Sequence, residues 1–312
     1  MKKYLSSLML LLAAMIWGFA FSAQKAAECV PPFTLGAARS LIAGIFLLSL
    51  VPLLDKLRHT GRHLCSRGKP LDFNRYELIG GAICGAVLAT ASFFQQFGMA
   101  SGADAGKASF ITALYVVLVP IYALTLKRRA PLNVWISIVI AVVGFYFLCI
   151  KGDLTVEGPE LIVCICSLIF PIHILAIDHF SPKCDGVRMS CIQFFAATVV
   201  NAMLALFTEM PLSLSGIWQS ILPILFLGIM SSGVAYTLQI LGQRGANPAA
   251  ASIIMSLESV FGVVGAAILL GERMTVREYI GAGIILVAVL LSQLDIDTLK
   301  KSFKNKKNAN IQ

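Results

Sequence analysis

The sequence contains ten stretches of about 20 mostly apolar residues, and these stretches constrain the fold more than any other feature. A helix rises 1.5 Å per residue, so roughly 20 apolar residues can cross the ~30 Å hydrocarbon core of a bilayer. The chain of 312 residues is 58% hydrophobic and 13% charged, whereas soluble domains are about 25% charged. The stretches cover residues 4–24, 33–54, 76–99, 106–126, 132–150, 159–178, 187–208, 217–241, 248–270 and 277–294.

We therefore expect an all-α integral membrane protein with ten transmembrane helices joined by short linkers. The first stretch also resembles a signal peptide, because Lys2 and Lys3 precede an apolar run. Trp17 and Gly18 interrupt that run, which is longer than a usual signal core, so a retained helix is favoured. Residues 295–312 are basic and polar, and we expect them to form a cytoplasmic tail.

The distribution of Lys and Arg predicts the orientation of the helices. With ten spans both termini lie on one side, and nineteen of the 25 Lys and Arg residues fall in the segments of that side. Cytoplasmic segments are rich in Lys and Arg, so we expect both termini to be cytoplasmic in the cell membrane. The net charge of +9 is thus a topology signal, and its spread over short linkers argues against nucleic-acid binding. The opposite side holds five basic residues: Lys25, Lys107, Lys151, Arg273 and Arg277.

Motifs for metals, cofactors and nucleotides are not found. The eight cysteines form no Cys-x-x-Cys pair, so neither a metal nor a cofactor is expected. The chain has no Walker A motif, which argues against ATP-driven transport. His173 and Asp178 have the His-x4-Asp spacing of acyltransferases, but residues five apart on a helix diverge by about 140°.

The second half of the sequence repeats the first. At a shift of 143 residues, "QFGMASGADAGKASFITALYVVL" (96–118) matches "QILGQRGANPAAASIIMSLESVF" (239–261) at eight of 23 positions. The shift pairs Gln96 with Gln239 and Tyr115 with Glu258. Five helices per half force the halves into opposite orientations, and such inverted repeats are typical of transporters. We expect repeats at 1–150 and 151–294.

Four stretches carry a resemblance to a known family. They are "IWGFAFSAQKA", "PFTLGAARSLIAG", "GADAGKASFITALYVVLVPI" and "ASIIMSLESVFGVVGAAILLGERMT". With these the chain resembles the EamA-like family of the drug/metabolite transporter superfamily over nearly its whole length. The resemblance implies ten helices, cytoplasmic termini, and export or exchange of small metabolites through a central cavity.

Polar residues deep in apolar stretches are candidates for lining that cavity. An ionisable residue inside a membrane span is costly and is a functional candidate by default. Glu258 lies about 15 Å into its helix, near mid-membrane, and is also our candidate for coupling transport to a proton or cation. The alternative is that Glu258 contacts Arg39 or Tyr115 only to hold the bundle together. The candidates are Trp17, Arg39, Gln96, Tyr115, His173, Tyr236, Gln239 and Glu258.

The sequence favours a secondary transporter that moves a small metabolite or drug-like molecule by alternating access. Its partners are then a small-molecule substrate and the lipid bilayer. A membrane-embedded enzyme or a non-transporting scaffold remains the alternative, and a cavity lined by Trp17, Tyr115 and Glu258 would favour the transporter.

Overall fold

The computed structural model is helical throughout the part of the chain that it describes. This part comprises residues 2–60, 73–103, 111–128, 130–150, 158–210, 214–244, 246–270 and 275–293, and it contains no β-strand. The expected tail at 295–312 lies outside the described residues. Within the described residues, helical segments are found in each of the ten apolar stretches.

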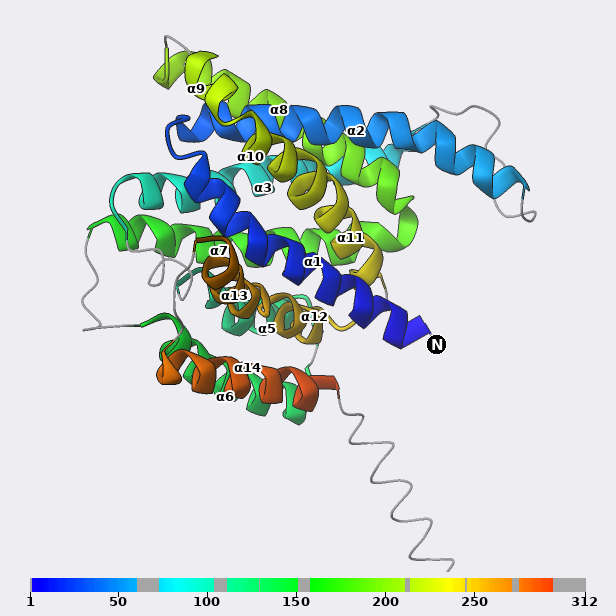
Figure 1. Ribbon diagram of the computed structural model, residues 1–312. Coiled ribbons are helices and arrows are strands. Elements are labelled where there is room, and N and C mark those ends of the chain that lie inside the picture. The colour runs from blue at the N-terminus through cyan, green and yellow to red at the C-terminus, as the bar shows by residue number, and fades with distance from the viewer. Residues whose placement is uncertain are drawn as a thin grey trace, which may run out of the picture.

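The described residues of the first half of the chain are arranged as helices (Figure 1). Four are α1 (Lys2–Ala26), α2 (Pro32–Thr60), α3 (Arg75–Ala100) and α6 (Leu132–Cys149). The segment Ile111–Thr125 contains α5 (Tyr115–Thr125).

The second half contains more interruptions than the first. It begins with α7 (Gly158–Phe180), a 3₁₀ turn (Ser181–Lys183), α8 (Gly186–Thr208) and the short α9 (Leu214–Gln219). Next come α10 (Ile221–Phe226), a π-helix η2 (Leu227–Ala235) and α11 (Tyr236–Gln243), which run on as one apolar segment. The last elements are α12 (Pro248–Met255), α13 (Glu258–Leu270) and α14 (Val276–Gln293).

Polar side chains at the helix starts explain where several helices begin. Asn74 accepts a hydrogen bond from the backbone N–H of Glu77, and the Glu77 carboxylate accepts one from the backbone N–H of Asn74. Asp185 caps the first N–H groups of α8, and Asn247 those of α12. Each cap satisfies backbone donors that the first turn of a helix leaves without partners.

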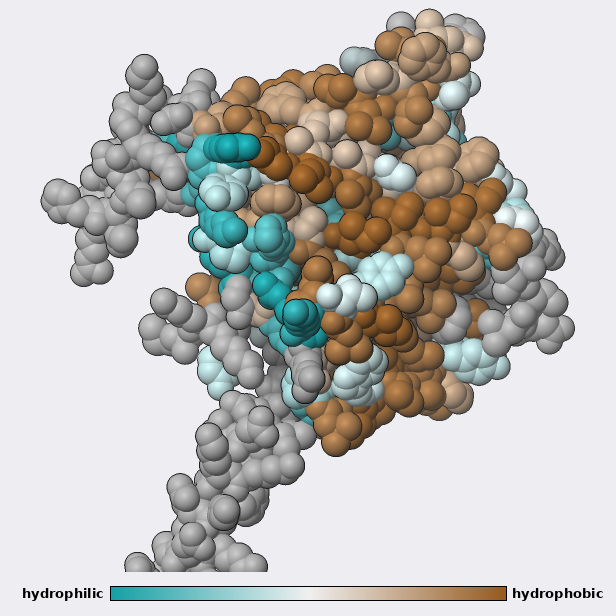
Figure 2. All heavy atoms as spheres, turned by 180° about the vertical axis from the view of Figure 1, so that it is seen from behind, coloured by the Kyte–Doolittle hydropathy of each residue, from teal (hydrophilic) through white to brown (hydrophobic). Residues whose placement is uncertain are grey.

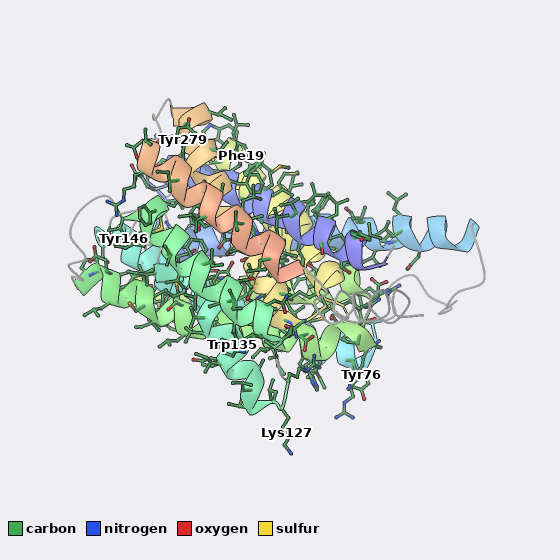
Figure 3. All side chains as sticks on the ribbon, turned by 90° about the horizontal axis from the view of Figure 1, so that it is seen from below. Phe19, Tyr76, Lys127, Trp135, Tyr146 and Tyr279 are labelled. Carbon is green, nitrogen blue, oxygen red and sulfur yellow. The ribbon has the colours of Figure 1, made fainter. Side chains whose placement is uncertain are left out.

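Among the described residues, seven helices are long and apolar enough to cross a membrane, and two shorter apolar helices accompany them. Large hydrophobic side chains cover much of the outside, and Figure 2 shows them as a broad brown surface with hydrophilic residues gathered along one edge. In Figure 3, Tyr146 and Tyr279 lie toward one end of the helices and Tyr76 toward the other. Aromatic residues favour the two membrane surfaces, so this is the distribution of a multi-pass membrane protein.

Helices of the first half pack mainly against helices of the second half. The most extensive pairs are α6 with α14, α3 with α7, α2 with α8 and α3 with α8, followed by α1 with α13. Glycines allow the backbones of α6 and α14 to approach, because a Cβ at Gly281 would lie 2.5 Å from the backbone N of Leu148. Small residues at such crossings are the usual means of helix association in membranes.

Polar interactions join α2 and α8 at both ends of the pair. At the start of α2, the Glu209 carboxylate accepts hydrogen bonds from the backbone N–H groups of Phe33 (2.8 Å) and Thr34 (2.7 Å). At the other end, Arg188 of α8 forms an ion pair with Asp55 of α2 at 2.6 Å. Contacts at both ends hold the two helices in register beside the interior site.

Candidate functional site

Two interrupted helices meet inside the bundle and bring Tyr115 and Glu258 together. α12 ends at Met255 and α13 starts at Glu258, while α5 starts at Tyr115 after a turn at Leu114. The Tyr115 hydroxyl donates a hydrogen bond to Oε1 of Glu258 at 3.4 Å. The two residues that the repeat alignment pairs are therefore in contact, each as the first residue of a half-helix.

A cavity of about 70 Å³ lies beside this contact. It is large enough for several water molecules, since one needs roughly 10–15 Å³ on this measure. Arg39 and Glu258 are the charged residues in its lining. Seven of the eight side chains predicted from the sequence line this central cavity: Trp17, Arg39, Tyr115, His173, Tyr236, Gln239 and Glu258.

The eighth candidate, Gln96, lies elsewhere. It lines a second, neighbouring cavity, and its sequence neighbour Gln95 lines the central cavity instead. The Gln95 side chain donates to the hydroxyl of Thr112 at 3.2 Å. The pairing of Gln96 with Gln239 is thus displaced by one residue, and Gln95 takes the place opposite Gln239.

The π-helix η2 explains the displacement. A π-helix inserts one extra residue into an α-helix. At the start of η2, Gly228 lies 143 positions after Gly85, and a Cβ at either glycine would crowd a backbone oxygen, that of Gln193 for Gly85 and that of Arg39 for Gly228. Beyond it, Gly98 and Gly242 are 144 apart, and each would crowd a backbone oxygen of the helix it crosses. The equivalence of α3 and α11 therefore shifts by one residue within η2.

Arg39 is held by the π-helix. Its Nε donates to the hydroxyl of Ser232 at 3.1 Å, and its Nη2 donates to the hydroxyl of Ser231 at 3.2 Å. Within the described residues Arg39 forms no ion pair with Glu258. Of the two contacts expected if Glu258 only holds the bundle together, the one with Arg39 is therefore not made, whereas the one with Tyr115 is.

Aromatic rings line the cavity together with the two charged residues. The Trp17 and Tyr236 rings lie 4.7 Å apart, and His173 meets Tyr236 edge-on at 5.9 Å. The Trp17 indole donates to the backbone oxygen of Ser231 at 3.2 Å. The imidazole Nε2 of the buried His173 lies 3.2 Å from Oε1 of Gln193. These contacts fix the ring orientations around the cavity.

Several neutral polar residues of the central cavity escaped the sequence analysis. Gln24 lies seven residues after Trp17, which is two helical turns and therefore the same face of α1; this spacing is a signal that could have found it. The side-chain oxygen of Gln239 is buried without a hydrogen-bond partner among the described residues. The residues missed are Gln24, Ser92, Gln95, Thr112 and Ser231.

Most of the cavity lining comes in pairs that are related by the repeat, while Gln24, Arg39 and Ser231 have no such mate in the lining. Each pair has one member in each half of the chain, and the offset is constant for each pair of helices. The offset is 153 for α1 and α7, 144 for α3 and α11, and 143 for the two interrupted helices. The pairs are Trp17/Phe170, Ala20/His173, Phe21/Ile174, Ser92/Tyr236, Gln95/Gln239, Thr112/Met255 and Tyr115/Glu258.

A metal site is not visible in the structure. Within the described ranges, no three His, Cys, Asp or Glu side chains gather closely enough to hold an ion. The chemistry of the cavity is that of one carboxylate, one guanidinium, aromatic faces and amides, which suits reversible binding of a polar solute.

Known proteins match this chain over nearly its full length. A protein from Archaeoglobus fulgidus, described as an uncharacterized transporter, is 30% identical over 300 residues, covering 95% of this chain and 88% of its own length. A second uncharacterized transporter, from Methanothermobacter thermautotrophicus, is 22% identical over 275 residues, covering 83% and 77%. A crystal structure with 17% identity shares the fold with a TM-score of 0.76, over 94% of this chain and 98% of the other.

The family model that matches this chain describes transporters, in agreement with the descriptions of the two relatives. The family model for EamA-like transporters matches residues 5–150 and 159–294. The seven long apolar helices agree with this assignment. The chain is a membrane transporter and belongs to the EamA-like transporter family.

Proposed function

We propose that the protein is a secondary transporter that moves a small metabolite or drug-like molecule through the central cavity by alternating access. The observation that carries this proposal is the repeat-paired lining of the cavity, with Tyr115 and Glu258 in contact. Transporters built from inverted repeats place their substrate site between the repeats, on interrupted helices. The cavity lies beside two interrupted helices, and pairs of its lining residues are related by the sequence repeat, which supports the proposal.

The proposed architecture is ten spans in two inverted five-helix repeats, at 1–150 and 151–294. The two family matches, 5–150 and 159–294, support these limits. Reciprocal contacts also support a twofold relation: α3 packs on α7 as α11 packs on α1, and α6 packs on α14. With the Lys and Arg bias, this architecture has both termini and the tail 295–312 in the cytoplasm and the helices in the cell membrane.

Glu258 is the proposed coupling residue. It lies at the start of a half-helix, where the helix dipole favours a negative charge. One oxygen of its carboxylate accepts from Tyr115, and the residue lines the cavity. A carboxylate in this position can gain and lose a proton as the cavity faces either side of the membrane. We propose that this exchange links substrate movement to a proton gradient.

The test begins by finding a substrate. Metabolites are compared inside and outside cells with and without the protein, and the hits are measured as flux into proteoliposomes. Glu258→Gln keeps the shape of the side chain but removes its titration. We expect gradient-driven flux to fall to the level of empty liposomes while passive exchange of substrate continues.

The matched control is Glu28→Gln, a variant of an exposed carboxylate in the turn between α1 and α2. It should transport as the unmodified protein does. Full gradient-driven flux in Glu258→Gln would remove Glu258 from the coupling step. Absence of flux for every candidate solute would instead favour a scaffold or an enzyme.

A further inference from the structure

The second cavity adjoins the central one, and Arg39 lines both. The second cavity lies toward the start of α2, where Pro32, Leu35 and Gly36 form part of its lining. Gln24, Ser92 and Tyr236 also face both cavities. Arg39 is therefore one of four residues that border both spaces, and the only charged one among them.

Arg39 supplies the charge of the second cavity. All other residues that line it are neutral, and the central cavity adds one carboxylate, that of Glu258. An unpaired charge in a membrane interior is costly and calls for a partner. The neutral polar residues around the second cavity are Gln24, Ser40, Ser92, Gln96, Asn201, Ser232 and the Tyr236 phenol.

The guanidinium has donors to spare. Arginine carries five N–H donors, and Arg39 uses two of them on the hydroxyls of Ser232 and Ser231. No carboxylate of the described chain accepts a hydrogen bond from Arg39, and the Glu258 carboxylate accepts one from Tyr115. The remaining N–H donors of Arg39 have no protein partner among the described residues, and Arg39 lines both cavities. The planar fork of arginine matches the two oxygens of a carboxylate or phosphate.

The π-helix sets the position of this group. Ser231 and Ser232 are neighbours in η2, and both hydroxyls reach the same guanidinium. Hydroxyl groups hold Arg39 without neutralising it, since neither carries a charge. A carboxylate in place of either serine would supply the missing negative charge and leave nothing for a ligand to add.

We propose that Arg39 binds an oxyanion group, a carboxylate or a phosphate. We propose further that the second cavity is an additional binding position, next to the central cavity, for a solute carrying that group. The assignment of the oxyanion to the transported solute rests on the proposed transport function. The binding of the oxyanion itself does not, so the two can be tested apart.

The test measures anion binding by the purified full-length protein in lipid nanodiscs. Thermal unfolding is followed in sodium acetate and in sodium phosphate, each against sodium chloride at equal ionic strength. A bound ligand raises the unfolding temperature with its concentration. We expect at least one of the two oxyanions to protect the unmodified protein, and the effective one names the group.

Three variants make the test specific. Arg39→Gln should need at least a tenfold higher oxyanion concentration for the same protection. Arg39→Lys, which keeps the charge but loses the fork, should fall between the two. Arg277→Gln is the matched control, because Arg277 stacks over the rings of Tyr146 and Phe147 and lines neither cavity; it should respond as the unmodified protein does.

The outcomes separate binding from transport. Equal protection of Arg39→Gln and the unmodified protein, or no protection by either oxyanion, would overturn the site. A lower unfolding temperature of Arg39→Gln without any anion reports only the lost serine contacts, so the concentration dependence is the deciding measurement. Oxyanion protection in a protein that carries no solute across proteoliposomes would uphold the site and reject the transport function.

Discussion

The hydroxyl of Tyr115 lies 3.4 Å from a carboxylate oxygen of Glu258, and each residue begins a half-helix. They are 143 positions apart in the chain, at the same place in the two repeats. One member of the pair is a carboxylic acid and the other a phenol, so the two halves contribute different chemistry to one contact.

Loss of the Tyr115 hydroxyl should weaken transport without abolishing it. Tyr115→Phe removes one long hydrogen bond to the Glu258 carboxylate but leaves the carboxylate in place. Such a bond is worth about 0.5–1.5 kcal/mol, which corresponds to a roughly two- to tenfold change in rate. Initial flux in proteoliposomes measures the change. A loss as complete as that of Glu258→Gln would show that the hydroxyl does more than orient the carboxylate.

The α6–α14 contact should be sensitive to a single methyl group. Gly281→Ala would place a Cβ 2.5 Å from the Leu148 backbone N and 2.8 Å from the Gly144 oxygen, so the helices must separate. We expect a loss of about 1–3 kcal/mol in stability, the usual cost of overpacking. Gly283→Ala on the same helix meets no atom within 4 Å and is the control, expected to be neutral or stabilising. Unfolding in detergent compares the two variants, and equal behaviour would contradict the packing.

The Glu209 contact should stabilise the start of α2. Glu209→Ala removes hydrogen bonds to two backbone N–H groups and to the hydroxyl of Thr34. The loss of a helix cap costs about 0.5–2 kcal/mol. We expect a lower unfolding temperature and increased proteolysis at the turn between α1 and α2. Glu28→Ala, in that turn and exposed, should leave both measurements unchanged.

The proposed topology predicts the side of the membrane on which reporters are found. A reporter fused after Lys301 should be cytoplasmic, as should one in the linker at 58–70. A reporter at Asp153 should be external. Asp153, Lys301 and most of that linker lie outside the described residues, so the measurement is independent of the structure. Signals on the same side from Asp153 and Lys301 would reject ten spans.

The sequence alone determined the membrane location, the helix positions and the pairing of Tyr115 with Glu258. These follow from local properties: apolar length sets the spans, Asn and Asp caps set helix starts, and the repeat offset sets equivalence. The tertiary structure decided which polar residues share a cavity. Gln95 lines the central cavity in place of Gln96 because η2 inserts a residue. Neither the composition nor the spacing of "LGIMSSGVA" predicts a π-helix.

The partner of Arg39 was likewise decided only by packing. The sequence offered Glu258 as its counter-charge, but the choice depends on where α2 crosses η2 and where α13 begins. There, two serine hydroxyls meet the guanidinium, and Tyr115 meets the carboxylate. Hydrophobic length is read residue by residue along one chain, whereas a side-chain contact needs the relative position of two helices, which only the folded bundle supplies.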